Sequence, residues 1–446
     1  MFFKEFPLPK EPVFPSFSVN IKELGARGDG KSDAKPMIDE AMARCNENGG
    51  GHIIIPEGTY FCDGPIHFKS HVDLHLEKGA VIRFSDEYEK YLPVVFVRME
   101  GIRCYNYSPL LYGIDLENIA VTGEGTLDGN GFLWWDLMHE KILNGIKPSG
   151  KLCDMARDGV PVEARVFGTP EDAIRPYFLQ FLRCKNVLIE GVRFIHSPFW
   201  TVAPAFCENV IVRGISHKTE KTTKGHTSYN TDTVNMDSCK NCLIEDIVID
   251  SSCDDSICVK SGKDQDGLLM NIPTENVLVR NCRFQNSGGM VVVGSETSGG
   301  IRNVCFRNIT GIDCIYGIHI KGARGRGNVI ENIDFEDIRM ERCGEGITIG
   351  HVFSHGSGDQ DQIPVIRNIS LENVTVTESL SGVILRGIPD HPVENLHFKN
   401  VQVSGNMVEE ISFVEGLHLE GVSLTKNEPF DREVLGGKKE GMQEGM

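Results

Sequence analysis

The sequence lacks any apolar run of the roughly 18 residues that a membrane-spanning helix needs. Its first ten residues, MFFKEFPLPK, also lack the apolar stretch and small-residue cleavage site of a secretory signal peptide. These two absences lead us to expect a cytoplasmic protein without a membrane partner.

Basic residues are scarce relative to acidic ones. The chain of 446 residues has 45 Lys plus Arg against 63 Asp plus Glu, a formal net charge of −18 at pH 7. Nucleic-acid-binding proteins present a basic face, so we expect no nucleic-acid partner. An anionic ligand would need a local basic patch.

A second cysteine pair at zinc-site spacing is also missing. Only Cys239 and Cys242 form a C-x-x-C pair among the 14 cysteines. Zinc sites of this kind normally need two such pairs, or a pair of histidines, at defined spacing. We therefore expect no zinc site, and we expect the cysteines to be free thiols packed as small apolar residues.

A repeated unit is abundant from about residue 115 onward. Each copy starts with a charged residue and Asn, followed by apolar residues at alternate positions, as in ENIAVTGEGTL, KNVLIEGVRFI and ENVLVRNCRF. After a first gap of 68 residues, the asparagines recur every 23 to 36 residues. They are Asn118, Asn186, Asn209, Asn241, Asn276, Asn303, Asn332, Asn368 and Asn395.

The repeat predicts a solenoid. Alternating apolar residues indicate strands, and the Gly, Asn or Asp that follows each run indicates a bend. Such a strand pair buries its apolar face only against neighbouring copies, so the repeats are expected to stack as coils of a parallel β-helix. Asn suits the bends because its side chain bonds nearby backbone and tolerates the left-handed conformation, which makes its expected role structural.

The remaining segments divide the chain around this solenoid. Residues 1–20 form an N-terminal extension, and residues 21–426 form the β-helix domain. Within that domain, the apolar spacing over residues 33–46 predicts a helix that caps the open end of the core. Residues 132–173 interrupt the repeat and are interpreted as a long loop or lid. The tail, residues 427–446, is expected to be frayed.

Three aspartates stand out as candidates for chemistry. Asp232 in YNTDTVNMDS precedes Asp254 and Asp255 in CDDSICVKSG by 22 and 23 residues, about one coil. The carboxylates should therefore stack on neighbouring coils, roughly 4.8 Å apart. Crowded carboxylates raise one another's pKa, so that one stays protonated while another is ionised. A carboxylic acid and a carboxylate flanking one bond are what glycoside hydrolysis requires.

These segments resemble glycoside hydrolase family 28, the polygalacturonase family. The resemblance runs from GARGDG near the start through SPFWTV, NTD, the Asp pair and VVVGSE to IHIK at residues 318–321. It implies an all-β fold, the right-handed single-stranded parallel β-helix of the pectin-lyase-like type. It also implies hydrolysis of galacturonate-containing oligosaccharides derived from pectin, with inversion at the anomeric carbon, and without a metal or other cofactor.

The resemblance further implies a role for each matching residue. Asp254 would be the general acid that protonates the leaving oxygen, while Asp232 and Asp255 would position and activate the attacking water. The residues expected to contact substrate are Asn230, Lys321, His319 and Glu296.

Three departures from the family pattern concern substrate recognition. His319 stands where the family usually has Arg, Asn286-Ser-Gly-Gly-Met290 replaces a Gly-His-Gly signature, and Asn235 ends an altered N-T-D-G-x-D motif. The loss of Arg removes a planar bidentate donor for carboxylates. The carboxylates are retained while these neighbours differ, so the reaction type is better indicated than the substrate.

Several functions therefore remain open. The leading hypothesis is an exo-acting hydrolase of imported galacturonate oligosaccharides. A related alternative cleaves rhamnogalacturonan or another glycoside with the same aspartates. A calcium-dependent pectate lyase and a non-catalytic β-helix that binds glycans are the alternatives of other classes. The oligomeric state is not indicated by the sequence.

Overall fold

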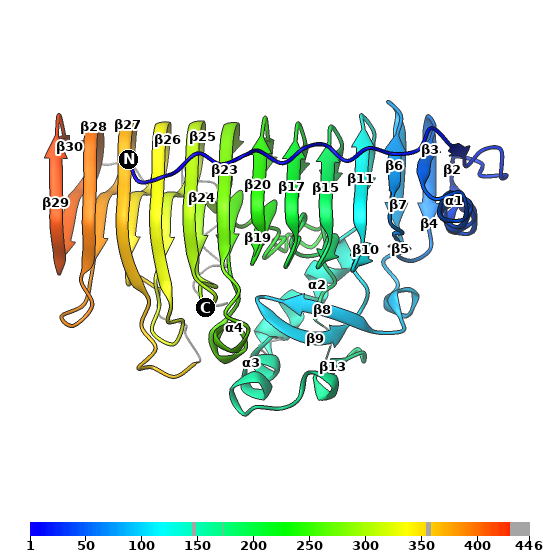
Figure 1. The fold of residues 1–446 in the computed structure, drawn as a ribbon, viewed down its shortest axis with the longest axis horizontal. Coiled ribbons are helices and arrows are strands. Elements are labelled where there is room, and N and C mark those ends of the chain that lie inside the picture. Colours follow the sequence, from blue (N-terminus) through cyan, green and yellow to red (C-terminus); the bar gives the residue numbers. More distant parts are fainter. Residues whose placement is uncertain (145–148, 173, 354–357, 429–446) are drawn as a thin grey trace.

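The computed structural model describes residues 1–144, 149–172, 174–353 and 358–428. Strands make up 51% of the structure and stack in parallel along one long axis (Figure 1). The fold is the predicted right-handed parallel β-helix. Residues 429–446, most of the predicted frayed tail, lie outside the described part.

The coils contribute strands to three parallel stacks. Stack A contains β1 (Ser18–Asn20), β3 (Gly51–Ile55), β6 (Val72–Leu76), β11 (Glu117–Gly123), β15 (Lys185–Glu190), β17 (Glu208–Arg213), β20 (Lys240–Glu245) and β29 (Val414–Glu420). Stack B contains β2 (Asp29–Asp33), β4 (Gly58–Cys62), β7 (Ala80–Phe84), β12 (Thr126–Asp128), β16 (Arg193–Ile195), β18 (Ser216–Lys218), β21 (Val248–Ser251) and β30 (Ser423–Lys426). Stack C contains β5 (Ile66–His67), β10 (Leu111–Ile114), β14 (Leu179–Leu182), β19 (Val234–Asp237), β22 (Ile257–Lys260) and β24 (Gly289–Gly294).

In the later coils, single long strands bend from one stack into another. They are β23 (Thr274–Gln285), β25 (Ile301–Lys321), β26 (Val329–Gly350), β27 (Val365–Arg386) and β28 (Val393–Ser412). The end of β25 continues stack C, because it pairs with β24 in parallel.

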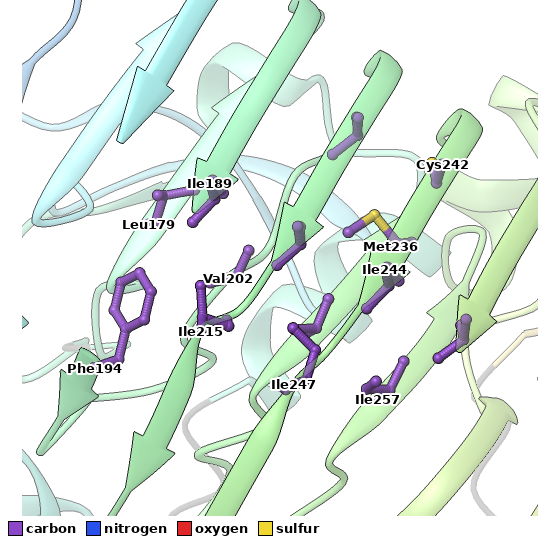
Figure 2. Packing of buried hydrophobic residues seen from close by; sticks show 14 of the residues in the cluster. Leu179, Ile189, Phe194, Val202, Ile215, Met236, Cys242, Ile244, Ile247 and Ile257 are labelled. Atoms are coloured by element: carbon purple, nitrogen blue, oxygen red, sulfur yellow. The ribbon is translucent and has the colours of Figure 1, made fainter. Parts of the chain in front are cut away.

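The core runs through the inside of the coils. Figure 2 shows Ile244 from stack A and Met236 and Ile257 from stack C pointing into it, all fully buried. All 14 cysteines are free and 12 of them are buried, which confirms the prediction of free thiols.

The repeated asparagines form a ladder along the bends. Asn209 donates from Nδ2 to Asn186 Oδ1 at 3.0 Å, and Asn276 donates to Asn241 Oδ1 at 2.9 Å. All nine adopt positive φ angles of 51° to 59°. The structural role predicted for Asn is thus confirmed, since only residues tolerant of this region fit the bend.

A helix covers the first coil, as predicted. α1 (Lys35–Glu47) buries Ile38, Ala41, Met42 and Cys45 against the end of the core. It lies at one end of the solenoid in Figure 1.

The segment interpreted as a loop or lid contains secondary structure. It includes α2 (Phe132–Leu143), α3 (Gly150–Arg157), η2 (Val162–Ala164) and β13 (Val166–Phe167). With the hairpin of β8 (Val95–Met99) and β9 (Ile102–Asn106), α3, η2 and β13 form what we call the side unit, which has its own apolar cluster. A bend of the chain between β7 and β8 holds η1 (Tyr88–Tyr91).

Buried ion pairs attach the side unit to the solenoid. Arg103 and Arg165 both bind Asp266 of α4 (Asp264–Met270), with Nε to Oδ2 at 3.0 Å and Nη1 to Oδ1 at 2.7 Å. Arg98 of β8 reaches Asp237 on β19 with Nε to Oδ2 at 3.1 Å. The side unit therefore lies against stack C.

The N-terminal extension runs along the outside of stack A and crosses most of the coils (Figure 1). Phe2 N donates to Asp334 Oδ1 at 2.9 Å, although 332 positions separate the two residues. Across the described residues, none of the helices combines the length and apolar character needed to cross a membrane.

Candidate active site

The three predicted aspartates meet where two strands of stack C begin. Asp232 lies two residues before β19, and Asp255 lies two residues before β22. Since Val234 pairs with Ile257 in the parallel register, Asp232 and Asp255 occupy equivalent places on adjacent coils. Oxygens of Asp232, Asp254 and Asp255 all lie within 4.8 Å of one another. The expected stacking of carboxylates is confirmed.

The three carboxyl groups differ in their electrostatic surroundings. Burial, followed by the charge of Asp255, raises the pKa of Asp254 from 3.8 to about 6. Burial and the charge of Asp254 raise the pKa of Asp232 well above its ordinary value. Asp255 instead binds Lys321, with Nζ 2.9 Å from Oδ2 and 3.3 Å from Oδ1. The cluster can therefore hold a proton on one carboxyl group beside an ionised carboxylate at mildly acidic pH.

Lys321, expected from the motif to bind a substrate carboxylate, also contacts the aspartate cluster. It stands at the end of β25, opposite Gly294 on the neighbouring coil. Its side chain is largely buried, which lowers its pKa, but the negative groups around it, Asp255 first among them, together raise the pKa above the ordinary value. An ammonium group has three N–H donors, so Lys321 can bind a second acceptor while it stays paired.

Glu296 is also part of the site, but it is already in an ion pair. Its Oε2 lies 2.7 Å from Nζ of Lys260, which is 3.9 Å from Asp232 Oδ2. Burial opposes the charge of Glu296, yet Lys260, Lys263 and Arg326 together lower its pKa below the ordinary value. Glu296 therefore neutralises a buried lysine beside the aspartates. The sequence analysis did not identify Lys260, which is the last residue of β22, the short strand that follows the Asp pair.

His319 differs from the arginine it replaces in charge as well as shape. It is 94% buried, and burial followed by the charge of Lys321 lowers its pKa well below the ordinary value. Its Nδ1 has no hydrogen-bond partner among the described residues, and its ring centre lies 4.6 Å from that of Tyr316. A neutral imidazole offers one donor and one acceptor, so His319 suits hydroxyl groups better than a second carboxylate.

Asn230 directs its side chain at the predicted acid. Its Nδ2 donates to Asp254 Oδ2 at 3.3 Å, while its Oδ1 accepts from Arg175 Nη2 at 2.8 Å. Sequence reasoning missed Arg175 because it precedes Asp254 by three coils and belongs to none of the motifs. Only stacking of the coils brings the two together.

Two glycines make room for the Asp pair. A Cβ on Gly289 would lie 2.3 Å from Asp255 Oδ1, and one on Gly288 would lie 2.8 Å from the Asp254 backbone. The Ser-Gly-Gly stretch thus packs directly against the aspartates.

The acidic cluster is flanked by cations from this chain. The ammonium groups of Lys260 and Lys321 each lie within 4.0 Å of one of its carboxylates. They supply the positive charge that a divalent ion would bring. The donor set therefore fits acid–base chemistry better than metal binding.

A family model and several known proteins match more than half of this chain. Residues 168–421 match the model of glycosyl hydrolases family 28. A solved hyperthermoactive exopolygalacturonase from Thermotoga maritima is 35% identical, with 94% of each chain covered and a TM-score of 0.83.

Two curated relatives are more distant. A probable polygalacturonase of Vitis vinifera is 28% identical, with 86% of this chain and 74% of that protein covered. An exo-poly-alpha-D-galacturonosidase of Dickeya chrysanthemi is 25% identical, with 88% of this chain and 68% of that protein covered.

Proposed function

Because this chain belongs to glycosyl hydrolase family 28 and is a pectin-degrading glycosidase, we propose that it releases single galacturonate units from the ends of oligogalacturonides. The observation that carries the proposal is the cluster of Asp232, Asp254 and Asp255 beside Lys321. Exo-action is supported by the exopolygalacturonase among its relatives, 35% identical over 94% of the chain.

In the proposed reaction, Asp254 gives its proton to the glycosidic oxygen as the bond from that oxygen to the anomeric carbon breaks. A water molecule attacks the anomeric carbon and loses a proton to Asp255, which is paired with Lys321. Asp232 has one oxygen, Oδ1, without a partner in the described residues, and it would orient this water. A proton thus passes from acid to leaving group and from water to base, as inverting hydrolysis requires.

The site also contains groups suited to a uronate. The third donor of Lys321 would bind the substrate carboxylate, and neutral His319 would bind a hydroxyl group. A charge-assisted bond of this kind contributes about 1.5 to 3 kcal/mol. Asn230 would act on Asp254 rather than on the sugar, and Glu296 would act through Lys260.

Product analysis tests the proposal. The purified protein and the Asp254→Asn variant would be incubated with tri-galacturonate and, separately, with a rhamnogalacturonan tetrasaccharide, and the products would be followed by NMR from the first minutes. We expect galacturonate released singly, with inverted configuration, and a loss of at least about 100-fold in the variant. A retained configuration would contradict the assignment of Asp255 as base. With a longer oligogalacturonide, initial products other than galacturonate and the chain shortened by one unit would contradict exo-action.

The same experiment separates the alternatives. Cleavage of the tetrasaccharide alone would identify a rhamnogalacturonan hydrolase. An unsaturated product that absorbs in the ultraviolet, lost on adding a chelator, would identify a lyase. Binding of both sugars without cleavage would identify a glycan-binding protein.

The pH dependence of the rate provides a second test. Asp254 must be protonated, so the rate should fall as pH rises through its pKa of about 6. The base must be ionised, so the rate should fall again at low pH. We expect a bell-shaped profile with an acidic optimum, and a flat profile from pH 4 to 8 would contradict the assignment.

A further inference from the structure

Arg175 is a buried cation that donates hydrogen bonds to neutral groups. Its side chain is 94% buried, and its guanidinium lies 4.8 Å from the centre of the Phe199 ring. Nη1 donates to Pro198 O at 3.1 Å and to Tyr229 O, and Nη2 donates to Asn230 Oδ1. In the described part of the chain it forms no ion pair within 4.0 Å. Burying a charge without an ion pair costs folding free energy, which suggests that Arg175 is retained for function.

The chemistry of the guanidinium determines how the Asn230 amide is turned. A guanidinium has only donors, so the Asn230 atom facing it must be the oxygen. The amide nitrogen is then on the other side, where it donates to Asp254 Oδ2 at 3.3 Å. The bond to Tyr229 O also holds the preceding peptide, next to the left-handed φ of 54° at Asn230.

We propose that Arg175 is a positioning residue, which holds the Asn230 amide in the one orientation that presents an N–H donor to Asp254. The proposal rests on the proposed role of Asp254 as general acid. If the amide turned over, Oδ1 would face the carboxyl group, and two acceptors would repel once Asp254 is ionised. Arg175 thus acts on the acid through Asn230, without touching substrate.

The proposal predicts a change in the pH profile. The charged and titratable groups around Asp254 are Asp232, Asp255, Lys260, Lys321, Tyr316 and Arg175 itself. A hydrogen bond to the ionised form lowers the pKa of a carboxyl group. Loss of the Asn230 donor should therefore raise the pKa of Asp254 and move the alkaline limb of the profile to higher pH. Burial lowers the pKa of Arg175 only to about 10, so it stays charged throughout this range.

A double-mutant cycle tests whether Arg175 acts on Asp254 through Asn230. The variants are Arg175→Met, Asn230→Gly, which keeps the left-handed backbone available, and the combination of both. We expect each single variant to lower kcat by about 10- to 100-fold with little change in KM. Each single variant should also shift the alkaline limb of the pH–rate profile to higher pH by about 0.5 to 1 unit. The double variant should have the same kcat and the same pH profile as Asn230→Gly. Independent, additive losses or an unmoved limb would overturn the proposal.

Two further variants test whether the effect of Arg175 comes from orienting the Asn230 amide, from its charge or from a loss of stability. Arg175→Lys keeps the charge but loses the fork of donors, so we expect it to resemble Arg175→Met. Full recovery in Arg175→Lys would show that charge alone is needed and would overturn the proposal. Arg165→Met removes another buried arginine, which pairs with Asp266 of α4, and should lower stability without moving the alkaline limb.

A measurement without substrate keeps this inference separate from the proposed function. The unaltered protein and Arg175→Met would each be compared with the same protein carrying Asp254→Asn. The difference in melting temperature within each pair, followed as pH is varied, reports the pKa of Asp254. We expect this pKa to be higher in Arg175→Met than in the unaltered protein. An unchanged pKa would overturn the inference, whereas a raised pKa in a protein inactive on every sugar would contradict only the proposed function.

Discussion

At the residue scale, Asp254 and Asp255 are adjacent and chemically identical, yet their neighbours differ. Asp255 binds the ammonium of Lys321, whereas Asp254 accepts hydrogen bonds from the Asn230 amide and from the Asp255 backbone N–H at 2.8 Å. A full positive charge stabilises a carboxylate more than neutral donors do. This difference supports the proposed role of Asp254 as the general acid.

The raised pKa of Asp254 predicts that the site destabilises the fold at neutral pH. The folded pKa of about 6 exceeds the ordinary value of 3.8, so the protonated form favours folding, and that contribution is lost as pH rises from about 4 to 6. Asp254→Asn should therefore be more stable than the unaltered protein at pH 7 to 8, by on the order of 1 to 3 kcal/mol. Below pH 4 the difference should disappear.

Thermal unfolding across this pH range measures the effect. The matched control is Asp250→Asn on the exposed side of β21, outside the acidic cluster. A variant that is less stable than the unaltered protein at pH 8 would contradict the raised pKa.

At the element scale, the bends of the coils depend on the asparagine ladder. Asn241 sits within it at φ 56°, donating to Asn209 Oδ1 at 3.3 Å and accepting from Asn276 at 2.9 Å. The position combines two requirements, a left-handed backbone and a side chain with both donor and acceptor. Gly416 occupies the equivalent place in the last coil with φ 68°, meeting the first requirement alone.

Substitutions at Asn241 separate these two requirements. Asn241→Gly keeps the backbone and loses the side-chain bonds, so we expect a cost of about 1 to 2 kcal/mol. Asn241→Ala also places a Cβ in the left-handed region, which adds about 1 kcal/mol or more. Urea denaturation measures the free energy of unfolding of both variants. If Asn241→Gly lost as much stability as Asn241→Ala, or more, the requirement for a left-handed backbone would be contradicted.

At the scale of the whole molecule, the N-terminal extension covers an apolar row on the outside of stack A. Outward positions in matching register carry Ala120, Leu188, Ile211, Leu243, Leu278 and Cys305. Phe14 packs on the first three and Phe3 and Phe6 on the last three. The row becomes polar at Asp334, which accepts from the backbone of Phe2 and Phe3. The extension thus ties together coils far apart in the chain.

Removing the two phenylalanines should weaken the fold but leave catalysis unchanged. Phe3→Ala with Phe6→Ala removes partly buried aromatic surface, at a cost of about 1 to 2 kcal/mol for each ring. Since stack A is a different face from stack C, kcat and KM should not change. Denaturant unfolding and steady-state kinetics measure the two effects, with Phe413→Ala, 54% exposed, as the control. A loss of activity without a loss of stability would contradict this separation.

Much of the fold was predictable because each coil repeats the same local requirements. Alternating apolar residues, the asparagine at every bend and the apolar spacing of α1 are local patterns, and each led to the observed element. The spacing of 22 and 23 residues likewise predicted that the three aspartates meet, since one coil separates them. The helices of the segment from residue 132 to 173 were not predicted, because they follow no repeat. Trp134 of α2 packs in the main core, and α3 belongs to the side unit.

By itself, the sequence determined the parallel β-helix, the three aspartates and the neighbouring Lys321, because period and motif spacing carry that information. Only the tertiary structure decided that burial raises the pKa of Asp254, that Glu296 is bound by Lys260 and that burial lowers the pKa of His319. It also decided that Arg175 reaches the acid through Asn230. These properties depend on burial and on contacts between residues far apart in the chain, and both arise only when the coils stack.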